Sequence, residues 1–239
     1  MPPPTPVLPD SFFAPVLAIG DRDLKIRWYM CVIINLSSLN YADVIPQVYS
    51  HLDSSLLSQL SHNDRFEAVH RIREGLTKSL GIAGAARTGN AIRIISHCTP
   101  EDLRLKSSPR SLETEETAIQ RGNEFFGRIY DGNPLFDVRD TERASPDYLF
   151  LVKDIVYGRL FSYDAIIDDT TSSYAMVSAL YGMNSPGQMR NHMIGMLLNG
   201  ASRDELIELQ KLLLGLAEIL GVTFRFEPVP VPTLPVEKN

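Results

Sequence analysis

The segment from residue 202 to 221 constrains the fold more than any other part of this sequence. Its leucines recur at the spacing of one buried helix face: Leu206, Leu209, Leu213, Leu216 and Leu220. Ser202 and Glu205 predict a capping box that opens this helix, and Gly221 predicts a left-handed residue that ends it. The chain must therefore bury an amphipathic helix here.

Other segments carry similar start and stop signals. A hydroxyl residue before proline predicts a helix start, because proline loses no amide hydrogen bond at the first helical position: Thr99, Ser145 and Ser185. Glycines predict helix ends: Gly81, Gly182 and Gly200. Alternation of apolar and polar residues is scarce, and residues 32–39 (VIINLSSL) are the best strand candidate. We predict an all-α fold of about eight to ten helices.

Proline is concentrated at both ends of the chain. Residues 1–9 hold five prolines and the tail after residue 225 holds four. We expect proline-rich arms at 1–19 and 226–239, extended and without a core of their own.

The region between the arms shows a weak internal repeat. Residues 64–82 match residues 204–222, and Leu80-Gly81 then aligns with Leu220-Gly221. We predict one helical unit used twice, with a degenerate first copy at 20–110 and a second copy at 111–225. Each copy has one apolar stripe, and we expect the two stripes to be buried against each other. They lie at positions 66, 69, 72, 76 and 80 and at positions 206, 209, 213, 216 and 220.

Charge and composition exclude several classes of partner. The formal net charge is -6 and no face concentrates lysine and arginine, which argues against nucleic acid. No apolar run approaches the ~18 residues of a membrane span, and no basic region precedes an apolar one at the start. We expect a cytoplasmic protein without a membrane partner. Cys31 and Cys98 predict neither a disulfide framework nor a metal site, and no cofactor is expected.

Three stretches of the second half carry a family resemblance: RGNEFFGRIYDGNP, SPDYLFLVKDIVYGRLFS and SPGQMRNHMIGMLLNGASRDELIEL. Together with REGLTKSLGIAGAARTGNAIRI in the first half, they resemble the carboxymuconolactone decarboxylase and alkylhydroperoxidase-D-like family, in the tandem-repeat form found in fungi. The resemblance implies an all-helical fold, a His-bearing helix at His192 and assembly into a homo-oligomer. Because this chain already holds two units, we expect a dimer or trimer.

Two departures from the family pattern narrow the activity. The peroxidase branch places two cysteines where this chain has Ser185 and Gln188, so thiol peroxidase activity is excluded. The decarboxylase branch places a glutamate near Ser173, and the nearest carboxylates here are Asp168 and Asp169. A serine cannot replace a general acid unaided, which puts the parent decarboxylation in doubt.

His192 leaves two interpretations open. It is either a half-buried core histidine that is hydrogen-bonded to a neighbouring helix, or a proton shuttle at a pocket wall. Tyr157 is the second candidate catalytic residue, at the end of its helix. Side chains that could bind a carboxylate or phenolate lie in the following loop and around the histidine helix: Arg159, Tyr163, Asp164, Ser173, Gln188 and Asn191.

Two functions from different classes remain. The first is a cofactor-independent lyase, isomerase or cyclase that acts on a small carboxylate, lactone or quinone or polyketide-type metabolite, with His192 as acid or base. The alternative is a non-catalytic, oligomeric binding or interaction module on the same fold. A cavity of a few hundred cubic ångströms bordered by His192 would favour the enzyme, and a solid core there would favour the module.

Overall fold

The computed structural model describes residues 4–131 and 136–234. Within these residues every regular element is a helix, which confirms the all-α prediction. The strand candidate at 32–39 is wrong, because its first seven residues lie in one long helix.

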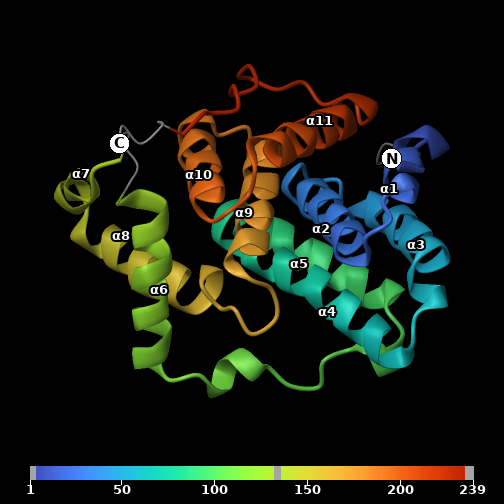
Figure 1. Ribbon diagram of the computed structural model, residues 1–239, viewed down its shortest axis with the longest axis horizontal. Coiled ribbons are helices and arrows are strands. Elements are labelled where there is room, and N and C mark those ends of the chain that lie inside the picture. Colours follow the sequence, from blue (N-terminus) through green and yellow to red (C-terminus); the bar gives the residue numbers. More distant parts are fainter. Residues whose placement is uncertain (1–3, 132–135, 235–239) are drawn as a thin grey trace.

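The α-helices are α1 (Asp10–Ala18), α2 (Arg22–Ser38), α3 (Ile45–Ser55), α4 (His62–Lys78), α5 (Leu80–Cys98), α6 (Glu115–Tyr130), α7 (Val138–Ala144), α8 (Pro146–Phe150), α9 (Asp169–Met183), α10 (Pro186–Leu198) and α11 (Arg203–Ile219). Short 3-10 helices are η1 (Ala42–Val44), η2 (Leu57–Gln59), η3 (Glu101–Leu103) and η4 (Pro109–Leu112), and η5 (Leu151–Phe161) is a π-helix. Figure 1 shows α6, α7 and α8 at one end of the molecule, α1 and α3 at the other, and α2 and α9 between them.

The centre of the fold is the contact between α2 and α9. Both helices are buried around most of their circumference, α2 over residues 29–38 and α9 over residues 171–181. Small side chains allow this close approach, and the Asn35 amide donates a hydrogen bond across it to the Ser178 carbonyl at 3.1 Å. The two helices therefore form the layer on which the others pack.

The apolar stripe of α11 is confirmed. All five of its predicted leucines are buried, and the capping box of Ser202 and Glu205 is present. In α4 the corresponding Val69, Ile72 and Leu76 are buried as well. Leu80 is 42% exposed, because it begins α5 instead of ending α4.

Most of the helix-end signals are correct. Ser145 caps α8, and Gly200 and Gly221 have φ of 99° and 67° after α10 and α11. Ser185 precedes α10 but makes no capping hydrogen bond with its side chain. Thr99 is wrong as a start for a long helix, because it ends α5 and donates its hydroxyl hydrogen bond to the Ile95 carbonyl, and only the short η3 follows.

Two glycines that were expected to end helices lie inside them. Gly81 belongs to α5, where a Cβ would lie 2.5 Å from Cζ of Phe161. Gly182 belongs to α9, where a Cβ would lie 2.5 Å from Cβ of Ser38, and Asn184 takes the left-handed position with φ of 47°. Both glycines permit close approach between elements that are distant in the sequence.

The contact pattern is compatible with a twofold arrangement. The helix α4 packs on α9 as α11 packs on α2, and α2 packs on α9. A pseudo-twofold axis that relates α4 to α11 and α2 to α9 would turn the contact between α4 and α9 into the contact between α11 and α2. The repeat itself, with its boundaries at 20–110 and 111–225, stays a prediction.

The expectation of an extended arm without a core of its own is wrong for residues 10–18, whereas residues 4–9 form no helix. Residues 10–18 form α1, and Phe13 and Val16 on it are buried. The Phe13 ring stacks on His51 of α3, with 4.0 Å between ring centroids. Aromatic packing therefore anchors α1 on the body of the protein despite its prolines.

The C-terminal tail has no helix in its described part. After α11 it runs back towards α10 (Figure 1), and the Phe226 backbone exchanges two hydrogen bonds with the Asn184 amide at 2.8 and 3.0 Å. The Gln210 amide donates to the Val229 carbonyl at 2.8 Å. The tail thus packs on its own chain.

The helices α6 and η5 cross at two glycines. A Cβ on Gly122 would lie 2.5 Å from Cα of Gly158, and one on Gly158 would lie 3.2 Å from the Ala118 carbonyl oxygen. This backbone contact fixes η5, and with it Tyr157, against α6.

Candidate functional site

His192 lies on the buried side of α10 and is 5% exposed. Its ring meets the Tyr130 ring edge-on, with 6.3 Å between centroids, and its Nδ1 atom has no hydrogen-bond partner. Burial lowers the pKa of the imidazole to about 4. At neutral pH the ring is therefore uncharged, so it can act as a base or as a hydrogen-bonding group but not as a general acid.

Tyr157, the other predicted catalytic residue, lies in the same aromatic cluster. Its hydroxyl donates a hydrogen bond to the Tyr130 hydroxyl at 3.0 Å, and burial holds the pKa of Tyr157 well above its usual value. The cluster is formed by α6, η5 and α9: Phe125, Phe126, Ile129, Tyr130, Tyr157, Phe161 and Met176. The structure thus brings His192 and Tyr157 together through Tyr130, a residue that the sequence analysis missed.

Three of the predicted substrate-binding residues lie elsewhere, Arg159 inside η5 and Tyr163 and Asp164 in the loop after it. Arg159 donates to the Glu113 carbonyl at 2.9 Å, the Tyr163 ring lies under Arg110, and Asp164 is 3.9 Å from the Arg121 guanidinium. Glu113 precedes α6 and Arg121 lies in its first half, whereas Tyr130 ends that helix, about 13 Å further along the helix axis than Arg121. The three residues therefore share no pocket with His192.

The remaining predicted binding residues are divided between surface and core. Gln188 is exposed and Asn191 is half-buried on α10. Ser173 is buried, donates to the Asp169 carbonyl and accepts from the Asn199 amide, both at 3.0 Å. Its hydroxyl therefore joins the start of α9 to the end of α10, which is a structural role.

Lys78 is a buried charged residue that the sequence analysis missed. Its ammonium group donates hydrogen bonds of 2.7, 2.7 and 2.6 Å to the Phe161 and Tyr163 carbonyls and to the Ser172 hydroxyl. Burial lowers the pKa of Lys78 to about 8. All three donors are satisfied, so this lysine ties α4 to the end of η5 and the start of α9.

A groove with the character of a binding site lies between α1, α2 and α11. This groove has a volume of about 730 Å³, and its walls are mostly apolar: Phe12, Ile19, Leu24, Trp28, Leu212 and Ile219. Its size lies in the usual range of small-molecule sites. His192 is not among its lining residues.

One arginine stands at the polar end of this groove. The Arg27 guanidinium lies over the Tyr174 ring, 4.5 Å from its centroid, and 3.6 Å from a Glu205 carboxylate oxygen. Its Nε atom is buried without a hydrogen-bond partner. Beside it, burial raises the pKa of the Cys31 thiol to about 11, so this sulfur is not a reactive thiolate.

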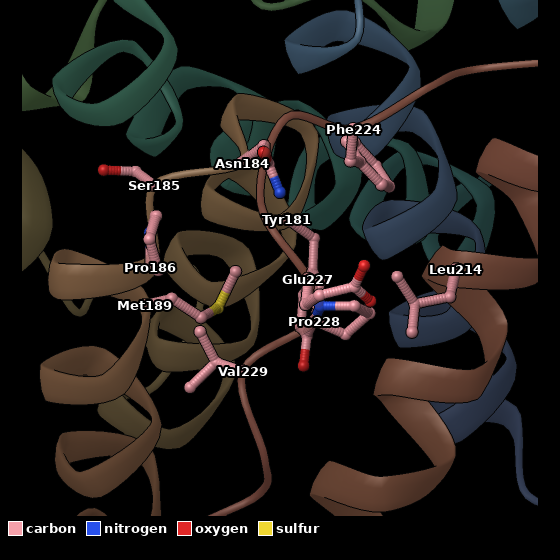
Figure 2. A pocket seen from close by; sticks show the side chains of 10 residues that line it. All are labelled: Tyr181, Asn184, Ser185, Pro186, Met189, Leu214, Phe224, Glu227, Pro228 and Val229. Atoms are coloured by element: carbon pink, nitrogen blue, oxygen red, sulfur yellow. The ribbon is translucent and has the colours of Figure 1, made fainter.

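A second, much smaller pocket lies under the tail (Figure 2). Glu227 and Pro228 lie between Met189 of α10 and Leu214 of α11. Its volume of about 20 Å³ suffices for about one water molecule. The tail therefore fills this region, and the groove is the better candidate for a functional site.

Sequence reasoning missed the groove because three helices, separated by up to about 200 residues, supply its walls. A local signal did exist. Leu212 and Ile219 lie outside the buried stripe of α11, and Gly215 lies between them. A second apolar face on an already buried helix indicates a further contact or a ligand.

The chain is similar to two yeast proteins of one name. Peroxisomal protein 2 of Schizosaccharomyces pombe is 23% identical over 155 residues, which cover 65% of this chain and 72% of that protein. Peroxisomal protein 2 of Saccharomyces cerevisiae is 20% identical over 259 aligned positions, which cover 84% of this chain and 91% of that protein. No protein-family model matches the chain. No solved structure matches it either.

Among residues 4–131 and 136–234, no helix has the length and apolar character that crossing a bilayer requires.

Proposed function

We propose that this chain is a small-molecule binding protein whose ligand occupies the groove between α1, α2 and α11. The observation that carries the proposal is the groove itself, with a volume of about 730 Å³, apolar walls and one arginine at its polar end. Apolar walls with a few convergent polar groups are the usual composition of a ligand site. The buried position of His192, away from this groove, supports binding over catalysis.

The chain contains a direct reporter of this binding. Trp28 is the single tryptophan of the sequence and lines the groove. We expect an apolar probe such as 2-decanone to change the tryptophan fluorescence of the full chain in a saturable titration.

Gly215→Leu should weaken the binding of this probe. Nothing lies within 4 Å of a Cβ at Gly215, so the new side chain enters the groove without a clash. Replacing a helical glycine should also raise stability by about 0.5–1 kcal/mol. We expect the affinity for 2-decanone to fall at least ~10-fold, because the leucine takes the place of part of the ligand.

Gly187→Leu is the matched control. A Cβ at Gly187 also has nothing within 4 Å, but this residue lies on α10 and does not line the groove. Its affinity for the probe should equal that of the wild type. Equal affinity of the Gly215 variant would place the ligand elsewhere and overturn the proposal.

We propose the peroxisome as the place of action, instead of the cytoplasm expected from the sequence. The support is the name that both relatives share, Peroxisomal protein 2, at 23% and 20% identity to this chain. A fluorescent fusion, tagged at either end in separate strains, should co-localise with a peroxisomal marker. Diffuse cytoplasmic fluorescence of both fusions would contradict this location.

A second candidate function is the cofactor-independent lyase, isomerase or cyclase. One observation favours it: His192 Nδ1 is buried without a partner, and the His192 ring packs on the ring of Tyr130, whose hydroxyl accepts a hydrogen bond from Tyr157. A substrate oxygen could occupy such a position. The resemblance to the carboxymuconolactone decarboxylase family, and assembly into a dimer or trimer that light scattering would detect, remain proposals with it.

A further inference from the structure

The geometry points to a ligand with an uncharged oxygen acceptor, such as a ketone, ester or lactone carbonyl, bound by Arg27 at the polar end of the groove. This inference rests on the proposed function, because it names the chemical class that the groove selects.

The Arg27 guanidinium is an unsatisfied donor. Its side chain is 18% exposed, and its closest carboxylate oxygen, on Glu205, is 3.6 Å away, which is beyond hydrogen-bond length. The Nε atom is buried and unpartnered, and the guanidinium carbon lies over the Tyr174 ring. The Nε atom itself is closed to the groove, but the side chain is partly exposed there, so a ligand oxygen that reaches the other guanidinium N–H groups would gain a hydrogen bond from a charged group.

The charges around the groove decide between a neutral and an anionic oxygen. The two lining cations, Arg27 and Lys211, already form ion pairs with Glu205 and Glu208. Asp204 adds a third lining carboxylate, which makes the lining net negative. A ligand carboxylate would therefore meet repulsion and would compete with Glu205 for the same arginine.

The other polar groups at this end do not supply a positive charge. The Tyr174 hydroxyl stays protonated, because burial and the adjacent Glu205 carboxylate raise its pKa. The groove thus combines apolar walls, hydrogen-bond donors and no free cation. Ketones, esters, lactones and quinones meet these requirements, whereas fatty carboxylates do not.

Three probes with the same apolar chain test the inference: 2-decanone, decanoate and decylammonium. We expect Trp28 fluorescence and calorimetry at pH 7.5 to show 2-decanone binding at least ~10-fold more tightly than decanoate. Decylammonium controls for charge, because the net negative lining attracts it without use of the arginine donors. Arg27→Met should lower the affinity for 2-decanone ~10-fold to 100-fold and should not lower the affinity for decylammonium.

Glu205→Gln should increase the affinity for decanoate, and a misfolded variant would not show such an increase. Glutamine preserves the capping box with Ser202, so α11 should keep its start. It removes the carboxylate that neutralises Arg27, and we expect decanoate to bind at least ~10-fold more tightly while 2-decanone changes less than ~3-fold.

The outcomes separate this inference from the proposed function. If the wild type binds decanoate more tightly than 2-decanone, or if Glu205→Gln leaves the affinity for decanoate unchanged, the inference is wrong and the groove remains a binding site. If none of the three probes changes Trp28 fluorescence or releases heat, the proposed function fails and the inference fails with it.

Discussion

Gly122→Ala should lower the free energy of unfolding by about 3 kcal/mol, the upper part of the range for an overpacked core. The added Cβ would lie 2.5 Å from Cα and 2.6 Å from N of Gly158, and 3.0 Å from the Tyr157 carbonyl carbon. These are backbone atoms, so no side-chain rotation relieves the overlap and α6 must separate from η5. Urea unfolding followed by circular dichroism measures the change.

Gly127→Ala in the same helix is the matched control. Its Cβ would meet the Asp131 carboxylate oxygen at 2.9 Å, the far end of a flexible side chain. Because that carboxylate can rotate away, helix propensity should dominate and stabilise the variant by up to about 1 kcal/mol. Equal effects of the two substitutions would show that the close crossing of α6 and η5 does not exist in solution.

The glycines show how far the sequence predicts the fold. Gly200 and Gly221 follow helices and take the left-handed conformation, and the pattern of apolar residues before them is sufficient to predict this. Gly81 and Gly182 carry the same local signal, but each lies where a distant element packs on the helix backbone. Local patterns therefore predict the helices well. They cannot distinguish a glycine that ends a helix from a glycine that lets another element pack against the helix backbone.

The candidate site was harder to predict than the helices. The sequence analysis selected His192 and Tyr157 separately, and Tyr130 joins them only because α6, η5 and α10 pack together. Lys78 lies in a segment rich in charges, so nothing local distinguishes it from a solvated lysine. Its burial depends on two carbonyl groups more than 80 residues away.

The groove was missed for a related reason. The prolines before and inside α1 favoured an extended arm, yet Phe13 packs on His51 and positions α1 beside α2 and α11. Without α1 the groove has no outer wall. Proline content describes the intrinsic preference of a segment, and aromatic contacts with the rest of the chain override it here.

His192 should make the protein less stable in mild acid. Its pKa is about 4 in the folded protein and 6.5 when exposed, so the unfolded chain binds the proton more tightly. Stability from the neutral imidazole is therefore complete above pH 6.5 and is lost as the pH falls towards 4. The gap between these values corresponds to a loss of ~3 kcal/mol.

His192→Gln should remove this part of the acid dependence, because glutamine does not titrate. The difference in unfolding free energy between wild type and variant should therefore shift by ~3 kcal/mol in favour of the variant between pH 7 and pH 4. Urea titrations of both proteins across this range measure it. A constant difference would show that the pKa of His192 is the same in the folded and the unfolded protein, so that its ring is not desolvated in solution.

The same variant separates the two candidate functions at neutral pH. If His192 is a core residue, loss of the imidazole packing should lower stability by ~1–3 kcal/mol, and the binding of 2-decanone at the groove should be unchanged. If His192 is a catalytic base, turnover should fall ~100-fold to 10,000-fold while the melting temperature changes little. Tyr157→Phe is the comparison variant for the neighbouring tyrosine. It removes only the hydroxyl that donates a hydrogen bond to Tyr130 and keeps the aromatic volume. The burial of His192 and the position of the groove outside its reach favour the first result.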